Sequence, residues 1–451
     1  EPLEGSAYLG AQRSRDPMSG EMIRLFLTAY GSGVRIKLRG AIQVDPVTGQ
    51  VTARFLDNPQ LPFSQLRLRL KGGPRAPLVN PPTCGTWDAH ARMTSWAGHE
   101  ETATDAIVVD ERCGTRGFAP TFLAGVTNPA AGADSPFTLT FGRGDGDQML
   151  SAISVDMPAG LLARIAELPE LCPDAAAAAG TCGEGSRIGS VRVATGPGTH
   201  PYRLPGRAYL TGPYKGAPFG MSIVVPAIAG PLDLGVVVVR AAVFIDRRTT
   251  AIRIVADPMP SILAGIPLQI REVTITVDRP RFMVNPTSCR EQGVGGEIAS
   301  LSGALARVAS RFQVGGCAAL PFRPRMALRV GAKGRPPRRL GTVPFEVALR
   351  MDPGQAANRV VQVNLPSTLT ARLEVINVNR SCSLEQYMAD RCPSSIGTAT
   401  AVTPLLREPL VGTVYLVRNP ARRLPDIMVR LRGQGDARLI EVPLSGVVTV
   451  T

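Results

Sequence analysis

The sequence predicts an all-β protein made of antiparallel β-sandwich units that are repeated in tandem. Three observations support this prediction. Apolar and polar residues alternate with a period of two along many short segments, which is typical of half-buried antiparallel strands. Glycine (47 residues) and proline (40 residues) make up about a fifth of the 451-residue chain, and this composition favours many turns. The eight cysteines fall into two sets of four, separated by about 205 residues.

The cysteine spacing indicates one structural unit that is copied along the chain. Outside the cysteines, the segment Pro62–Cys84 matches Pro267–Cys289 without a gap, and Phe137–Pro158 matches Phe345–Pro366. A Gly-x-x-Tyr-Leu sequence occurs three times, with its tyrosine at Tyr8, Tyr209 and Tyr415. The two cysteine sets are Cys84, Cys113, Cys172 and Cys182, then Cys289, Cys317, Cys382 and Cys392, at offsets of 205, 204, 210 and 210 residues.

The repeat also predicts where the units begin and end. Loose segments rich in glycine, proline and small or charged residues precede Phe137 and Phe345, as linkers do. Residues 136–343 are therefore expected to form one complete unit, built from one sandwich or two smaller ones. Residues 1–135 are expected to be the C-terminal part of a preceding unit, and residues 344–451 the N-terminal part of the next. The alternative is that both flanking segments are complete domains.

Individual strands can be assigned in chain order. Residues 22–30, 34–44, 51–56 and 66–70 alternate apolar and polar side chains, and residues 234–245 and 251–256 flank the polar turn 246–250, which predicts a hairpin. Residues 45–49 occupy the matching turn of the earlier copy. Short helices are expected only at 160–168 and 175–180. Short strands separated by turns favour a sandwich of the immunoglobulin-like type.

The cysteines predict local disulfides and an oxidising compartment. The recurring spacings favour the pairs Cys84–Cys113, Cys172–Cys182, Cys289–Cys317 and Cys382–Cys392. A zinc site is the rival interpretation, but the chain has no Cys-x-x-Cys motif and only three histidines, His90, His99 and His200. Because disulfides persist in oxidising compartments, we expect an extracellular or cell-surface protein.

The formal net charge of +14 does not by itself indicate nucleic-acid binding. Arginine is scattered along the strands, where alternation places it on the solvent face, whereas nucleic-acid-binding proteins concentrate basic residues in patches with aromatic residues. An anionic cell-envelope polymer remains a possible partner. No segment offers the roughly 20 uninterrupted apolar residues of a membrane helix, so no membrane span is expected.

Catalytic motifs are not found, and we expect no enzyme activity and no cofactor or metal site. The chain contains no Gly-x-Ser-x-Gly elbow, Walker loop or His-Glu-x-x-His motif. Two short motifs overlap between Arg143 and Asp147: the adhesion tripeptide Arg-Gly-Asp and an Asp-Gly-Asp sequence that resembles part of a calcium loop. The matching segment of the other copy is a plain turn, so the simpler interpretation is a hairpin tip.

The segment from Phe55 to Gly85 resembles sequences of a known group of proteins. The pattern Phe-x-x-x-Pro-x-x-Pro-Phe, followed by alternating leucines and Asn-Pro-Pro-Thr-Cys-Gly, is similar to that of long secreted tandem-repeat proteins of GC-rich bacteria. The turns at Met157-Pro158 and Leu365-Pro366, each followed by a cysteine pair and an Ile-Gly step, extend the resemblance. It implies a cell-surface setting and a repeated architecture, and it transfers no active site.

Two functional hypotheses follow. The first is a structural protein of an extracellular fibre, filament or stalk, in which the incomplete ends are completed head to tail by another copy or by flanking repeats of a longer chain. The second is an adhesin or binding module for glycans or anionic envelope polymers. A glycan binder predicts an exposed aromatic platform, for which Trp87 and Trp96 are the only tryptophans.

Peptide mapping of the native, unreduced protein tests the predicted pairing. The expected result is four linked peptide pairs, each within one cysteine set, because the recurring spacings place the partners of each pair close together in the chain. Free thiols, or a link between a cysteine before residue 200 and one after it, would show that the pairing is wrong.

Overall fold

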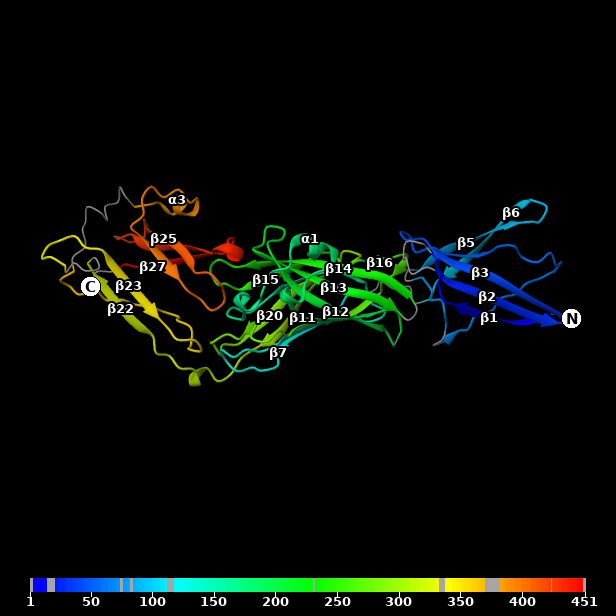
Figure 1. Cartoon of the computed structure of the whole chain (residues 1–451), viewed down its shortest axis with the longest axis horizontal. Coiled ribbons are helices and arrows are strands. Elements are labelled where there is room, and N and C mark those ends of the chain that lie inside the picture. Colours follow the sequence, from blue (N-terminus) through cyan, green and yellow to red (C-terminus); the bar gives the residue numbers. More distant parts are fainter. Residues whose placement is uncertain are drawn as a thin grey trace.

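The computed structural model describes residues 3–13, 21–73, 76–81, 84–111, 117–198, 200–229, 232–331, 337–369, 381–422 and 424–448. It is an all-β fold, and Figure 1 shows an elongated molecule with a central body between two smaller parts. We call these the N-terminal part (described residues of 3–111), the central barrel (117–320) and the C-terminal part (325–448).

The N-terminal part contains a four-stranded antiparallel meander and a separate hairpin. The predicted strands at 22–30, 34–44 and 51–56 correspond to three strands of the meander. Residues 66–70, which were also predicted to form a strand, lie in no strand and are exposed. The strands are β1 (Glu4–Gly10), β2 (Glu21–Gly31), β3 (Val34–Val44), β4 (Val51–Phe55), β5 (Gly85–Thr94) and β6 (Glu100–Val109).

The central barrel is one antiparallel sheet that curves almost into a closed cylinder. Its order is β21-β20-β9-β15-β14-β13-β12-β11-β18-β8-β7. The ends meet where Ser310 Oγ, on β21, accepts a hydrogen bond from Ala124 N (3.2 Å) and donates one to Ala124 O (3.1 Å) on β7. The strands are β7 (Thr121–Val126), β8 (Phe137–Gly142), β9 (Leu150–Asp156), β11 (Arg187–Thr195), β12 (Tyr202–Thr211), β13 (Phe219–Ala229), β14 (Leu232–Ile245), β15 (Ile252–Ala256), β18 (Ile270–Val277), β20 (Gln292–Ser300) and β21 (Leu305–Phe312).

This barrel differs from the predicted pair of stacked sheets, although both architectures alternate inward and outward side chains. The sheet bends where the register shifts in β11, in β13 and at the end of β20, because a β-bulge increases the local twist of a strand. The strand pairing also crosses both predicted unit boundaries: β7 pairs with β8 on either side of residue 136, and β22 (Arg325–Val330) pairs with β23 (Phe345–Arg350) on either side of residue 344. The division into units stays a prediction.

Both ends of the barrel contact the neighbouring parts. At one end, β10 (Leu162–Ala163) and the 3₁₀ turn η3 (Ile165–Glu167) replace the predicted helix at 160–168, and β10 pairs with β19 (Met283–Val284). There Ala166 N donates to Leu405 O of the C-terminal part (3.2 Å), and Arg407 donates to Leu168 O. At the other end, the hairpin of β16 (Ile262–Leu263) and β17 (Ile266–Pro267) turns at Gly265, which lies against Val44 and Asp45 with φ of 81°. A side chain at Gly265 would collide with that neighbour.

The C-terminal part contains the β22–β23 hairpin and a four-stranded meander. Its strands after the hairpin are β24 (Gly397–Ala401), β25 (Leu410–Val417), β26 (Asp426–Arg432) and β27 (Glu441–Gly446). The short helix α3 (Leu384–Met388) begins at Ser383, whose side chain forms a capping box with Gln386. Among the described helices, none is long and apolar enough to cross a membrane.

Among the residues that the structure describes, disulfides join Cys172 to Cys182, Cys289 to Cys317 and Cys382 to Cys392. The predicted partner of Cys84, Cys113, lies outside the described residues. The two ten-residue loops have the same local structure, since each encloses a short helix, α1 (Asp174–Ala179) or α3. The first cysteine of each loop donates its amide to a strand end, at Leu210 O or Leu416 O (both 2.9 Å). Such bridges indicate an oxidising, extracellular-type environment.

A buried arginine holds each disulfide loop on the outer face of its sheet. The Arg240 guanidinium lies 4.2 Å from the centre of the Tyr214 ring and donates to Asp174 at the start of α1 (3.0 Å). The Arg430 guanidinium lies 4.5 Å from the centre of the Tyr387 ring in α3 and pairs with Asp390 (3.0 Å). A planar guanidinium can stack flat on a ring while the N–H groups at its edge bind a carboxylate, and the compact ammonium of a lysine lacks this flat stacking face.

We predict that Arg430→Lys lowers the stability of the C-terminal part by about 1–2 kcal/mol, because the stacked contact with Tyr387 is lost in a buried site. Hydrogen exchange of β25 and β26 amides in increasing urea would measure this. The control is Arg422→Lys, whose partly exposed ion pair with Asp426 (3.0 Å) should change stability by less than about 0.5 kcal/mol. Equal losses in both variants would contradict a special role for Arg430.

Candidate functional site

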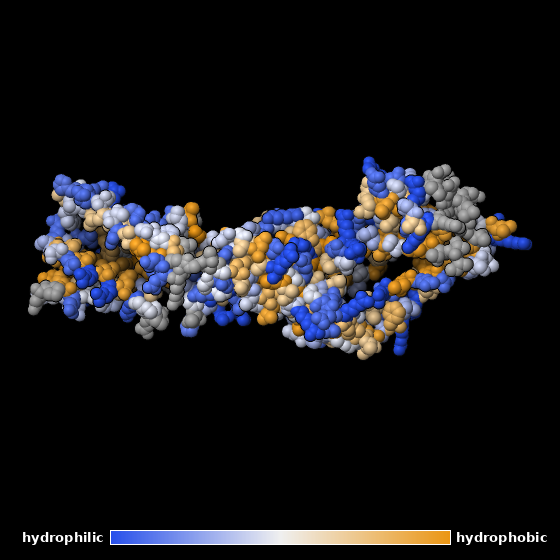
Figure 2. All heavy atoms as spheres, turned by 180° about the vertical axis from the view of Figure 1, so that it is seen from behind, coloured by the Kyte–Doolittle hydropathy of each residue, from blue (hydrophilic) through white to orange (hydrophobic). Residues whose placement is uncertain are grey.

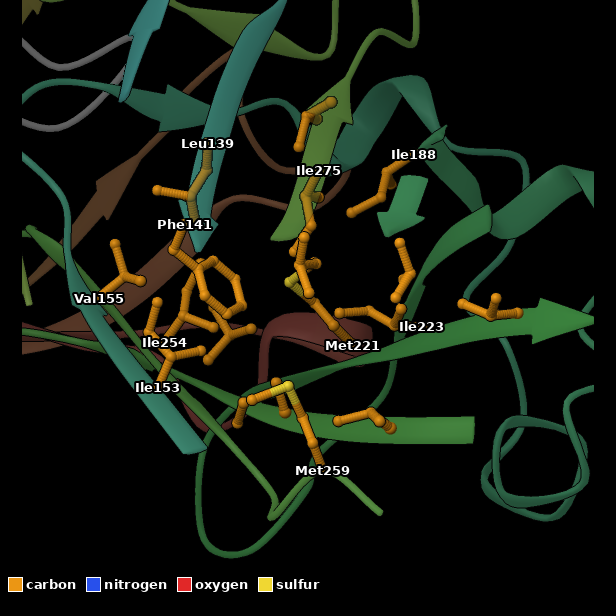
Figure 3. Close-up of a pocket in the computed structure, with 18 of the residues that line it drawn as sticks. Leu139, Phe141, Ile153, Val155, Ile188, Met221, Ile223, Ile254, Met259 and Ile275 are labelled. Carbon is orange, nitrogen blue, oxygen red and sulfur yellow. The ribbon is translucent and has the colours of Figure 1, made fainter. Parts of the chain in front are cut away.

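The most distinctive internal feature of the described residues is an apolar lumen inside the central barrel. Inward-facing side chains from successive strands surround it, and Figure 3 shows Phe141 of β8, Ile153 of β9, Ile223 of β13 and Ile254 of β15 converging on the same space. Alternation along each strand produces this lining, since residues two apart point to the same face. Along β14, for example, Val237, Val239, Ala241 and Val243 all face the lumen.

The side chains do not fill the lumen. The cavity has a volume of about 180 Å³. In barrels of eight strands the side chains just fill the interior, and a wider cylinder leaves space. The mid-strand residues Ile223, Ile254 and Ile275 therefore keep accessible surface although they point inward. At about 24 cal/mol per Å³, an empty cavity of this size costs the fold about 4 kcal/mol.

The chemistry of the lining is uniform. All of the side chains that line the lumen are hydrocarbon or methionine thioether, except for the Thr195 hydroxyl. Such a surface offers dispersion contacts and almost no hydrogen-bond partner, so it would neither hold ordered water nor bind a sugar or an ion.

The two ends of the lumen differ. At the end nearer the C-terminal part, the lining includes the buried side chains of Met157, Phe282 and Met283, and Ala163, which pairs with Met283, is partly exposed. At the end nearer the N-terminal part, Thr195, Val237 and Leu268 line the lumen and are partly exposed. The β16–β17 hairpin lies at this second end, where the lining residues keep more accessible surface.

The Arg-Gly-Asp motif is not presented as a flexible adhesion loop. The Arg143 side chain is buried, and its guanidinium donates to Ile270 O (2.9 Å) and to Gly144 O (3.0 Å). The Asp145 carboxylate accepts from Gly198 N (2.9 Å) and pairs with Arg271 (2.5 Å). These contacts order the segment that leads from β8 to β9. The predicted hairpin tip is wrong, because β8 and β9 are not paired with each other.

Metal-ligating clusters are absent from the described part of the chain. No group of three or more histidine, cysteine, aspartate or glutamate side chains converges there, and this includes Asp145 and Asp147. The two tryptophans lie on the β5–β6 hairpin and are both exposed, at 43% for Trp87 and 64% for Trp96. The Trp96 indole donates to Asn58 O (3.0 Å), which fixes its ring against the preceding loop.

A second candidate site consists of apolar surfaces on the two terminal parts, where Figure 2 shows hydrophobic residues at the surface. In the C-terminal part, alternate residues of β23 are exposed at Phe345 (44%), Val347 (38%) and Leu349 (45%). In the N-terminal part, Leu66, Leu68 and Leu70 are exposed in the segment that was predicted to form a strand. Contiguous apolar surfaces of this kind are typical of interaction sites.

The lumen and the exposed apolar surfaces are thus the features from which a function can be argued. Neither contains a nucleophile, a general base or a ligand set for a metal among its described residues. No protein-family model, curated protein or solved structure matches the chain.

Proposed function

We propose that this protein is a structural component of an extracellular fibre, filament or stalk, in which each terminal part is completed by a neighbouring unit of the same kind. The observation on which this depends is a difference in burial between matched positions. Phe137, Leu139 and Phe141 on β8 are 4%, 7% and 2% exposed inside the central barrel. Their sequence counterparts on β23 are the exposed residues Phe345, Val347 and Leu349.

The residues that match β9 show the same difference in burial. Ile153 and Val155 on β9 are buried in the barrel, whereas the matching residues Val361 and Val363 are exposed and lie in no strand. Apolar residues at these positions stabilise the fold only when strands lie on both sides of them. In the central barrel, β20 and β15 supply those strands. Among the described residues of the C-terminal part, no strand pairs with residues 360–365.

The N-terminal part contains an unpaired segment of the kind that the C-terminal part lacks. Its exposed segment 66–70 matches residues 271–275 of β18, which lies between β11 and β8 in the barrel. By this pairing, segment 66–70 of one unit fits between β24 and β23 of the next. The barrel register, in which Ile275 pairs with Leu139 and with Val191, would place Leu70 opposite Val347 and Ala399.

Shared turn geometry supports the view that the parts are units of one kind. Asp45 Oδ1 accepts hydrogen bonds from Val47 N, Thr48 N and the Thr48 hydroxyl, and Asp246 Oδ1 accepts the same three from Arg248 N, Thr249 N and the Thr249 hydroxyl. Likewise, the β5–β6 and β20–β21 hairpins turn with equivalent bonds, from Gly98 N to Ser95 O and from Gly303 N to Ser300 O. Each pair of turns is separated by 201 or 205 residues.

The disulfides favour the extracellular setting of this proposal, and they suit a structure that resists unfolding outside the cell. Unpaired strand edges recruit partner strands, and head-to-tail contacts of that kind propagate into filaments rather than closing into a dimer.

Cysteine cross-linking between copies tests the proposed register. A Leu70→Cys chain mixed with a Val347→Cys chain should form a disulfide-linked dimer on mild oxidation, because the two Cα atoms would be paired. The native cysteines would not interfere, since no free cysteine is found among the described residues. The matched control is Glu346→Cys, one residue away on the opposite face of β23, which should give little dimer.

Light scattering at increasing concentration complements the cross-linking. Assemblies larger than a dimer are expected, and Val347→Asp should dissolve them by placing a charge at the apolar contact. A chain that stays monomeric at high concentration, with equal cross-linking at positions 346 and 347, would contradict the proposal.

The alternative is an adhesin or a binding module, and the exposed Trp87 and Trp96 favour it. Exposed aromatic rings bind sugar faces, and the net charge of +14 would attract anionic envelope polymers. Tryptophan fluorescence would separate the two functions: a glycan that shifts the emission of the native chain, but not of Trp87→Ala, supports binding.

A further inference from the structure

We propose that the lumen of the central barrel binds one uncharged hydrocarbon chain, such as a short acyl group or the end of a longer lipid chain. The ligand enters at the end that contains Thr195, Val237 and Leu268, with its methyl end towards Phe282. This role is independent of fibre assembly, because the lumen lies inside a barrel that is already complete.

The volume sets the size of the ligand. The cavity of about 180 Å³ exceeds the cavity of roughly 150 Å³ that, in an engineered protein, stays dry and binds benzene. If a methylene group takes about the 30 Å³ that a water molecule occupies in the liquid, the lumen has space for a chain of about six carbons.

The lining sets the class of the ligand. A sugar, a peptide or an anion would lose its hydrogen bonds to water and find no replacement, because Thr195 is the only hydroxyl-bearing residue that lines the lumen. A hydrocarbon chain loses nothing of this kind and gains dispersion contacts with side chains that now face empty space.

The entrance explains how a polar headgroup is tolerated. Beyond Leu268, Gly196 N donates to Gln269 O (2.9 Å), and the ordered loop with Asp145 and Arg271 lies at this edge of the barrel. A headgroup at the rim would stay in contact with water and with these polar groups while the chain lies inside.

Benzene, a neutral six-carbon probe whose binding is followed by saturation-transfer NMR, tests the site with the full chain. The probe should bind the native protein, and Val239→Phe, which fills the lumen from β14, should weaken binding at least tenfold. The matched control is Val236→Phe on the same strand, whose side chain faces outward and is exposed at 51%. The control should bind the probe with an affinity within twofold of that of the native protein. Because the apolar surfaces of the terminal parts are unchanged in both variants, a difference between the variants reports on the lumen.

Competition by linear alcohols provides a measurement that needs no variant. From butanol upward, each added methylene should strengthen displacement of the probe about fourfold, which corresponds to the free energy of burying one methylene. The gain should stop at about six carbons, where the lumen is full. Absence of probe binding, equal binding by both valine variants, or a gain that continues without a plateau would each overturn the proposal.

Discussion

The near-closure of the central sheet is the constraint on which the rest of the structure depends. In the central sheet, the inward side chains of a strand are buried where strands lie on both sides of that strand. β8 illustrates this, because Phe141 is buried between β7 and β18, whereas Leu349, its sequence counterpart, is exposed on a hairpin with one neighbour. Burial in this protein is therefore a property of the whole cylinder rather than of any pair of strands.

The outer face of the sheet is organised by a different principle. Each ten-residue disulfide loop fixes a short helix on the strands next to it, and helices of five or six residues are too short to be stable alone. The Ser222 hydroxyl donates to Ala177 O (2.8 Å) beneath α1, and Arg430 donates to Tyr387 O beneath α3. The loops thus replace a second layer of helices or strands with a covalent link and a few polar contacts.

Much of the strand content could be predicted from the sequence, because alternation along β3 or β14 is visible in the residues themselves. Curvature could not be predicted, since a sandwich and a barrel have the same alternation and differ only in which distant strands meet. Residues 66–70 alternate well but lack a partner in the described structure, and a strand requires one. The lumen could not be predicted from the sequence either, because a filled and an unfilled barrel interior contain the same types of apolar residue. The burial of Arg143 could not be predicted, because one of its acceptors, Ile270 O, is distant in the sequence.

The strand order also governs when the barrel can form during synthesis. β9 ends at Asp156, yet its two neighbours are β15 and β20, and β20 ends at Ser300. At ribosomal rates of roughly 5–20 residues per second, β9 waits about 7–30 seconds for its second neighbour. During this time an apolar strand with free backbone groups is exposed, and pairings between distant segments are the slow steps of folding. A nascent chain of this topology therefore needs protection from aggregation until its last strands have emerged.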